Sequence, residues 1–108
     1  MRDEIPPGTL DMLILRTLAR GGEQHGYEIA NSIRRVSKDI LQVEEGSLYP
    51  ALQRMLLKGW VVAEWGVTDG NRRARYYKLT AAGRKQLEAE MAQFDRLMGA
   101  IARVLQTA

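Results

Sequence analysis

The sequence predicts a mainly α (α+β) domain built from three helices, a β-hairpin and one long final helix. Apolar residues recur at helical spacing in four segments, and two short runs rich in β-branched and aromatic residues lie between the third and the fourth. Prolines and glycines separate these segments. With 108 residues, of which 45% are hydrophobic, the chain can form one modest core but not two.

The first two predicted helices span residues 9–19 and about 26–36. Thr9 follows a proline pair and is placed to cap the first helix, which Gly21-Gly22 ends. The apolar stripe of the first helix consists of Leu10, Leu13, Ile14 and Leu18. The stripe of the second consists of Ile29, Ala30, Ile33 and Val36. Both helices are therefore expected to bury one face.

The third predicted helix runs from about residue 45 to residue 58, before Gly59. The side predicted to be buried carries Leu48, Ala51, Leu52, Met55 and Leu56. The opposite side carries Gly46, Pro50, Gln53, Arg54 and Leu57, with Ser47 and Tyr49 on its two flanks. If Pro50 lies in the first turn of this helix, it is tolerated because the N–H groups there lack partners in any case. If the helix begins a turn earlier, the proline ring faces the carbonyl of residue 46, and that residue is a glycine, which leaves room for the ring.

Two strands are predicted at residues 60–65 and 72–79, joined by a turn around Asp69-Gly70. In the second strand Tyr77 and Leu79 are expected to face inward, and Tyr76 and Lys78 outward. Trp60 and Trp65 lie at the two ends of the first strand and point to opposite faces. One of them is expected in the core. The other packs against the last helix or lies at a dimer interface or ligand pocket.

The last predicted helix extends from Thr80, its N-cap, to about Gln106, and is roughly 40 Å long at the usual rise per residue. Its apolar residues have the spacing of a helix–helix seam. They are Leu87, Met91, Phe94, Met98, Ile101 and Leu105. Because the domain is shorter than this helix, part of the seam should protrude and pack against a second copy; the alternative is packing within its own domain.

Three helices followed by a two-stranded wing are the plan of a winged helix-turn-helix domain. Residues 1–79 are the expected DNA-binding domain, and residues 80–108 the expected dimerisation helix. In such a domain the second helix of the helix-turn-helix pair enters the major groove, which makes residues 45–58 the recognition helix. A dimer would present two such helices about 34–36 Å apart to a roughly palindromic operator.

The positive charge of the chain is concentrated in one segment. Of the net charge of +3, residues 67–86 carry six Lys or Arg against one acidic residue, Asp69, which leaves the rest of the chain slightly acidic. This basic segment is either a solvated charge run or a surface for a polyanion. The residues suited to double-stranded DNA are Ser47, Tyr49, Pro50, Gln53 and Arg54 on the helix, and Arg72, Arg73 and Arg75 on the wing.

Several short motifs resemble the PadR family of bacterial transcriptional regulators. They are HGYEI at 25–29, EGSLYPALQR at 45–54, GW at 59–60, RR at 72–73, YYKLT at 76–80 and Gly83, so the resemblance spans about residues 9–83. The single long last helix is similar to the smaller PadR subfamily. One departure is Leu56-Leu57, where the family often has an acidic pair.

The resemblance implies a dimeric winged-helix repressor whose last helix, with help from the first, forms the dimer. It implies DNA contacts from Ser47, Tyr49 and the wing arginines. Some small relatives bind planar apolar compounds between the subunits, next to an aromatic residue of the last helix, and Phe94 occupies that place here. Met91 and Met98 flank it with adaptable side chains, although a dimer seam alone explains them too.

Composition excludes other classes of protein. The chain has no cysteine, which removes disulfides and thiolate chemistry, and its one histidine, His25, suits helix capping or packing rather than a zinc site. No phosphate-binding loop, nucleophile elbow or carboxylate pair appears, so we expect neither an enzyme nor a cofactor. No segment is apolar enough to be a signal peptide or membrane span, which favours a cytoplasmic protein. The rival interpretation is a winged-helix module that binds another protein and has no specific DNA target.

Overall fold

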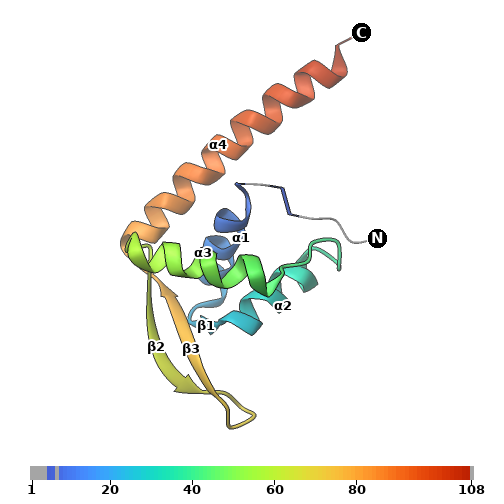
Figure 1. Cartoon of the computed structure of the whole chain (residues 1–108). Coiled ribbons are helices and arrows are strands. Elements are labelled where there is room, and N and C mark those ends of the chain that lie inside the picture. The colour runs from blue at the N-terminus through green and yellow to red at the C-terminus, as the bar shows by residue number, and fades with distance from the viewer. Residues whose placement is uncertain (1–4, 7, 108) are drawn as a thin grey trace.

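A computed structural model describes residues 5–6 and 8–107. The elements along the chain are helix α1 (Leu10–Gly21), strand β1 (Gln24–His25), helices α2 (Gly26–Val36) and α3 (Glu45–Leu57), strands β2 (Val61–Val67) and β3 (Arg73–Leu79), and helix α4 (Ala81–Gln106) (Figure 1). The predicted mainly α (α+β) class and the winged helix-turn-helix order are confirmed. The outer limits of the two expected units, residues 1 and 108, lie outside the described residues.

The sheet has three strands in the order β1-β3-β2 and is antiparallel throughout. Strands β2 and β3 form the predicted wing, with Val61 opposite Leu79 at its base and Val67 opposite Arg73 near its tip. Strand β1 was not expected, because two residues are too few to show any periodicity. It pairs His25 with Tyr76 and so attaches the start of α2 to the edge of the wing.

The core lies where α1, α2 and α3 meet the base of the wing and the start of α4. Its largest fully buried side chains are Ile14, Leu15, Leu18, Ile29, Leu48, Leu52, Met55 and Val61. The prediction for the second helix is wrong at Val36, which is 61% exposed because α2 ends there and its last turn projects past the core. The other apolar residues predicted to be buried on the first three helices lie in or against the core.

The end of α3 is joined tightly to the start of α4. Gly59 has a φ of 75°, and the N–H groups of Gly59 and Trp60 donate to the carbonyls of Leu56 and Met55 in a Schellman motif. Thr80 caps α4 as predicted, accepting from the Gly83 N–H at 3.0 Å, and its hydroxyl donates to the Gly59 carbonyl at 2.7 Å. A Cβ at Gly83 would collide with the backbone carbonyl of Trp60.

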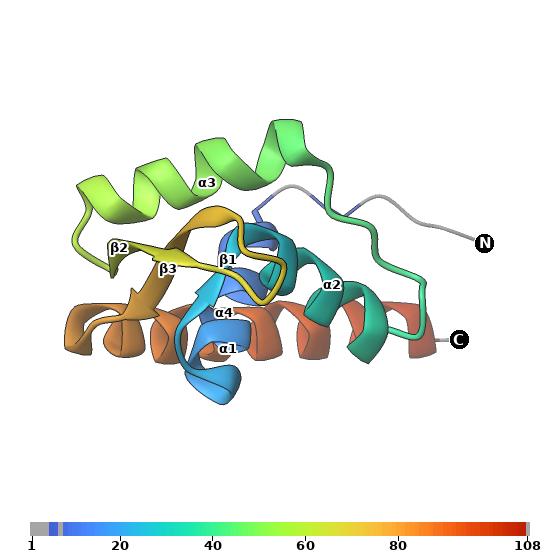
Figure 2. The same cartoon turned by 90° about the horizontal axis from the view of Figure 1, so that it is seen from below.

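Helix α4 extends well beyond the rest of the domain (Figure 1), so the whole molecule is elongated, with extents of 58 × 33 × 22 Å along its principal axes. Only Gly83 and Leu87, near its start, are buried. Figure 2 shows α3 and α4 on opposite sides of the domain, and α1 packs against both helices. Among the described residues, no helix is both long enough and apolar enough to cross a bilayer.

Candidate nucleic-acid interface

Helix α3 presents a continuous exposed face, which we call the outer face. It consists of Gly46, Pro50, Gln53, Arg54 and Leu57, flanked by the exposed Ser47 and Tyr49. The assignment of sides made from the sequence is confirmed for this helix: Leu48, Ala51, Leu52 and Met55 are buried. Leu57, which stands where the PadR family often has an acidic residue, is 78% exposed and points into solvent. The outer face combines two residues of low bulk with polar side chains.

Pro50 is in the interior of α3 rather than in its first turn. The helix begins at Glu45, and Pro50 is its sixth residue, so its missing N–H leaves the carbonyl of Gly46 without the usual helical partner. The sequence left open whether Pro50 lies in the first turn or one turn further into the helix, and the structure shows the second arrangement. A Cβ at Gly46 would have nothing within 4 Å, and the surface beside the proline ring is open.

Tyr49 connects α3 to both α2 and the wing. Its ring lies on Gly26, the first residue of α2, where a Cβ would come within 2.8 Å of the Tyr49 hydroxyl oxygen. The pKa of Tyr77 on β3 is raised above its ordinary value, mainly because the side chain is buried. The Arg75 guanidinium opposes this shift, and the neighbouring Tyr49 adds to it. Tyr49 is still 46% exposed, so one edge of the ring is available to a ligand on the outer face. The role of Gly26 was missed in the sequence, although it lies within the HGYEI motif.

On the side of the outer face away from Tyr49, Arg54 forms an ion pair with helix α1. Its Nη2 atom lies 3.0 Å from Oδ1 of Asp11, and its side chain remains 54% exposed. The two residues are 43 positions apart in the chain, and no local pattern could have predicted the pair. The Asp11 carboxylate neutralises part of the positive charge on the outer face.

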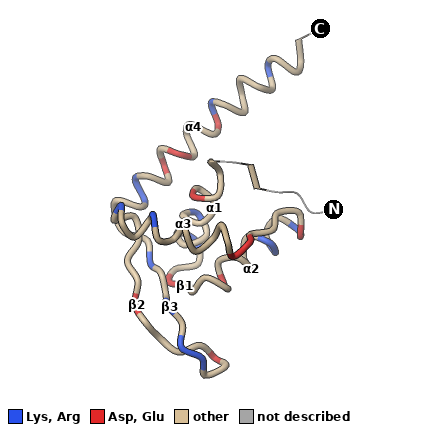
Figure 3. Tube along the Cα trace, in the orientation of Figure 1, with Lys and Arg blue, Asp and Glu red and all other residues tan. Residues whose placement is uncertain are grey.

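The wing carries its three arginines, Arg72, Arg73 and Arg75, exposed near its tip (Figure 3). The guanidinium of Arg73 lies over the ring of Trp65, 4.6 Å from the ring centroid. Trp60 is the tryptophan that packs against the core, with the Lys58 ammonium 4.7 Å from its ring. Trp65 is 60% exposed, so its expected packing against the last helix is not observed.

His25 is a capping residue, as predicted. Its Nδ1 accepts from the Glu28 N–H at 3.3 Å, and the Glu28 carboxylate accepts from the His25 N–H at 3.1 Å, which together form a capping box. The ring also makes an edge contact with Tyr76, at 5.3 Å between centroids. His25 therefore fixes the start of α2 beside the wing. The described residues contain no group of three possible metal ligands.

The six apolar residues predicted for the seam of the last helix divide into two groups. Leu87 is 5% exposed and lies in the core of its own domain, so it has little surface left for a second chain. Met91, Met98 and Ile101 are 39–42% exposed, and Leu105 is 78% exposed. Phe94 is partly buried. Two further apolar residues on the protruding part, Leu97 and Val104, are 54% and 74% exposed.

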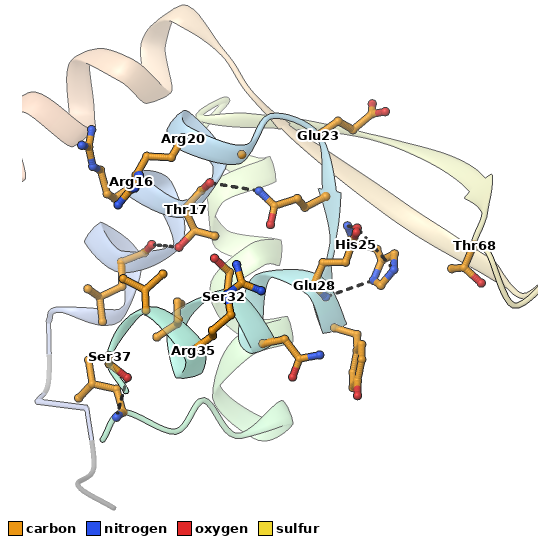
Figure 4. A pocket seen from close by; sticks show the side chains of 18 of the residues that line it. Arg16, Thr17, Arg20, Glu23, His25, Glu28, Ser32, Arg35, Ser37 and Thr68 are labelled. Atoms are coloured by element: carbon orange, nitrogen blue, oxygen red, sulfur yellow. Dashed lines mark hydrogen bonds and ion pairs between the residues drawn. The ribbon is translucent and has the colours of Figure 1, made fainter. Parts of the chain in front are cut away.

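A concave region of about 860 Å³ lies between α1, β1, α2 and the turn of the wing (Figure 4). Arg16, Arg20 and Arg35 line one part of it, and Glu23 and Glu28 another. Neither Phe94 nor Met91, the two residues expected at a ligand site, lines this region. Its charges are mixed and its lining is largely exposed, so it does not continue the basic surface of the wing.

Residues 14–89 match the Transcriptional regulator PadR-like family. The chain is 34% identical over 79 residues to Transcriptional regulator Rv3488 of Mycobacterium tuberculosis, which covers 73% of this chain and 70% of that protein. A transcriptional regulator from Clostridium thermocellum has a similar structure, with a TM-score of 0.81 at 27% identity over 89% of this chain and 92% of that one.

A PadR family transcriptional regulator from Eggerthella lenta is also similar, with a TM-score of 0.80 at 28% identity over 94% of this chain and 85% of that one. The three proteins compared are transcriptional regulators and not enzymes. The resemblance seen in the short motifs is thereby confirmed at the level of the family.

Proposed function

The chain belongs to the PadR-like family of transcriptional regulators, which bind DNA, and from this premise we propose that it is a cytoplasmic homodimeric repressor of a palindromic operator. The observation that carries the proposal is the position of polar and basic side chains on two neighbouring exposed elements. The outer face of α3 and the basic wing both lie on the surface, and no part of the described chain covers them.

The proposed DNA contacts divide by chemistry. Gln53 and Arg54 can pair with purine edges in the major groove, and Ser47 and Tyr49 can donate to phosphate oxygens at its rims. Pro50 and Gly46 contribute by their small size, because they let the DNA approach the helix closely. Arg72, Arg73 and Arg75 are suited to the backbone or to a narrow minor groove, where arginine is attracted by the negative potential.

The proposed dimer forms along α4. Met91, Phe94, Met98, Ile101 and Leu105 follow one another at seam spacing, and four of the five are at least 39% exposed in the single chain. An apolar surface of this length on a protruding helix is stabilised by burial against an equivalent surface, and a two-fold axis supplies one. Two recognition helices related by that axis would lie about one turn of DNA apart.

The proposed effector is a small planar apolar compound bound between the two α4 helices. Phe94 offers a ring for stacking, and Met91 offers a flexible thioether that adapts to varied apolar shapes. Such a compound would relieve repression if it favoured a dimer geometry in which the recognition helices no longer fit the operator.

Fluorescence anisotropy tests the proposal. The protein would be titrated against a labelled duplex from upstream of its own gene and against a scrambled duplex, at several salt concentrations. We expect tighter binding to the native duplex and an affinity that falls steeply with salt. If neither duplex is bound even at low salt, DNA recognition is disproved for this chain. The protein-interaction alternative would then account for the exposed surfaces.

A further inference from the structure

The exposed tryptophan of the wing has no role in the function described above. Trp65 is 60% exposed, although an indole is the largest apolar side chain that a strand can carry. It contributes little to the core, which Trp60 and Val61 already close at the base of the wing. An exposed aromatic residue of this size, on an element expected to contact DNA, needs an explanation.

Trp65 lies between two arginines on one face of the wing. Trp65 is directly opposite Arg75, and Val67 is directly opposite Arg73, so Arg73 is the diagonal neighbour of the indole. Side chains alternate between the faces of a strand, which places these residues on the same face as Tyr77 and Leu79. That face is buried at its base, where Tyr77 has Tyr49 of α3 as a neighbour, and exposed at its tip.

The indole constrains Arg73. The guanidinium lies 4.6 Å above the ring centroid, within the range of an attractive cation–π contact. A guanidinium that uses one flat side for stacking keeps the N–H groups along its edge free, and those groups bind phosphate in a fixed, bidentate geometry. Among the residues that the structure describes, neither Arg73 nor Arg75 forms an ion pair with a carboxylate.

We propose that Trp65 is a positioning residue for DNA binding, which holds the Arg73 guanidinium ready for the phosphate backbone beside the major-groove site. The side chain of Arg73 is then already ordered in the free protein. Binding to DNA no longer has to include the entropic cost of ordering it, and the affinity is higher for that reason. The proposal rests on the proposed function, and it assigns to the wing a rigid contact rather than a diffuse positive charge.

A double-mutant cycle in the full-length protein tests it, with operator affinity measured by anisotropy at fixed salt. Trp65→Val keeps a β-branched residue suited to the strand, and we expect it to weaken binding about two- to five-fold, as an exposed cation–π contact allows. Arg73→Ala should weaken binding further. Because Trp65 acts through Arg73, the double variant should bind no more weakly than Arg73→Ala alone.

Two further variants serve as controls. Trp65→Phe retains a π face and should retain most of the affinity, whereas Val62→Ala, on the opposite face of the same strand, should change nothing. Melting temperatures identify any variant that is misfolded. Unchanged affinity in Trp65→Val would overturn the proposal, and so would additive losses, which would mean that the indole touches DNA itself. Failure of the wild-type protein to bind any duplex would instead disprove the proposed function.

Discussion

The ring of Tyr49 lies directly on Gly26, so helix α3 and the start of α2 meet at a position where any larger side chain would displace the ring. A Cβ at residue 26 would be 2.8 Å from the Tyr49 hydroxyl oxygen and 2.9 Å from Cε1, both closer than real contacts allow. The first residue of α2 has no backbone need for glycine, since its φ is not positive. Space for Tyr49 therefore explains the glycine.

The first prediction concerns this contact. Gly26→Ala should lower the free energy of unfolding by about 1–3 kcal/mol, as overpacking does, although alanine favours a helix. It should also displace Tyr49 and weaken operator binding. Chemical denaturation and anisotropy measure the two effects. Adding Tyr49→Ala removes the clash and should restore stability but not binding; a double variant as unstable as Gly26→Ala would contradict this explanation.

Removing two wing arginines should weaken binding to all DNA sequences alike. In the variant Arg72→Ala with Arg73→Ala, two phosphate contacts are lost, so the slope of log affinity against log salt should become shallower by about 2. Titrations at several salt concentrations measure this slope. The matched control is Arg96→Ala with Arg103→Ala, which removes the same charge from exposed positions on α4. Equal slopes in the two double variants would refute a specific role of the wing.

Gln53→Ala should instead reduce sequence preference. A glutamine that pairs with a base edge contributes about 1–3 kcal/mol of discrimination, whereas its loss leaves the phosphate contacts unchanged. We therefore expect affinity for the operator to fall about 5- to 160-fold while affinity for a scrambled duplex stays the same. Competition binding with both duplexes gives the ratio. If that ratio does not change, Gln53 does not read sequence.

Replacing Asp11 should strengthen DNA binding. Asp11→Asn removes the carboxylate 3.0 Å from Arg54, so it frees a cation on the outer face and removes a negative charge near the DNA. The stability of the protein should change by only about 0–1 kcal/mol, as for other exposed ion pairs. Anisotropy at moderate salt measures the gain in affinity. Glu88→Gln, an exposed carboxylate on α4, is the control and should have no such effect.

The seam of α4 should decide the oligomeric state. Ile101→Glu with Leu105→Glu would bury like charges in the proposed interface, and we expect a folded monomer with reduced operator affinity. Light scattering after size-exclusion chromatography gives the mass, and circular dichroism the helix content. Ala100→Glu adds a charge at an exposed position away from the seam and should remain dimeric. A wild-type protein that is already monomeric would contradict the dimer.

The sequence predicted those parts of the molecule that depend on local chemistry. The C-terminal end of α3 followed from Gly59, whose positive φ permits the Schellman motif, and the start of α4 followed from Thr80. Thr9 was placed correctly before α1 but makes no capping bond, because its hydroxyl donates to the carbonyl of Pro6 instead. Strand β2 continues to Val67, two residues farther than expected, and the ring of Tyr76 covers Gly66.

The features that could not be predicted all depend on contacts between distant parts of the chain. Strand β1 exists because Tyr76 and Tyr77 offer it an edge, and its own two residues carry no signal. The ion pair of Arg54 with Asp11 joins different helices, and the stacking of Arg73 on Trp65 requires the register of the wing. For the candidate DNA surface, the sequence therefore indicated which residues are exposed but not which of them are already held by a neighbour.

The bonds between Thr80, Gly59 and Trp60 have a mechanical consequence. They fasten the base of α4 to the end of α3, and the close approach of Gly83 to the Trp60 carbonyl leaves no room for a hinge. We therefore expect the two helices to turn together as one rigid unit. In the proposed dimer, a small change in the angle at which the two α4 helices cross would swing both recognition helices. Their separation would then no longer match the pitch of the DNA.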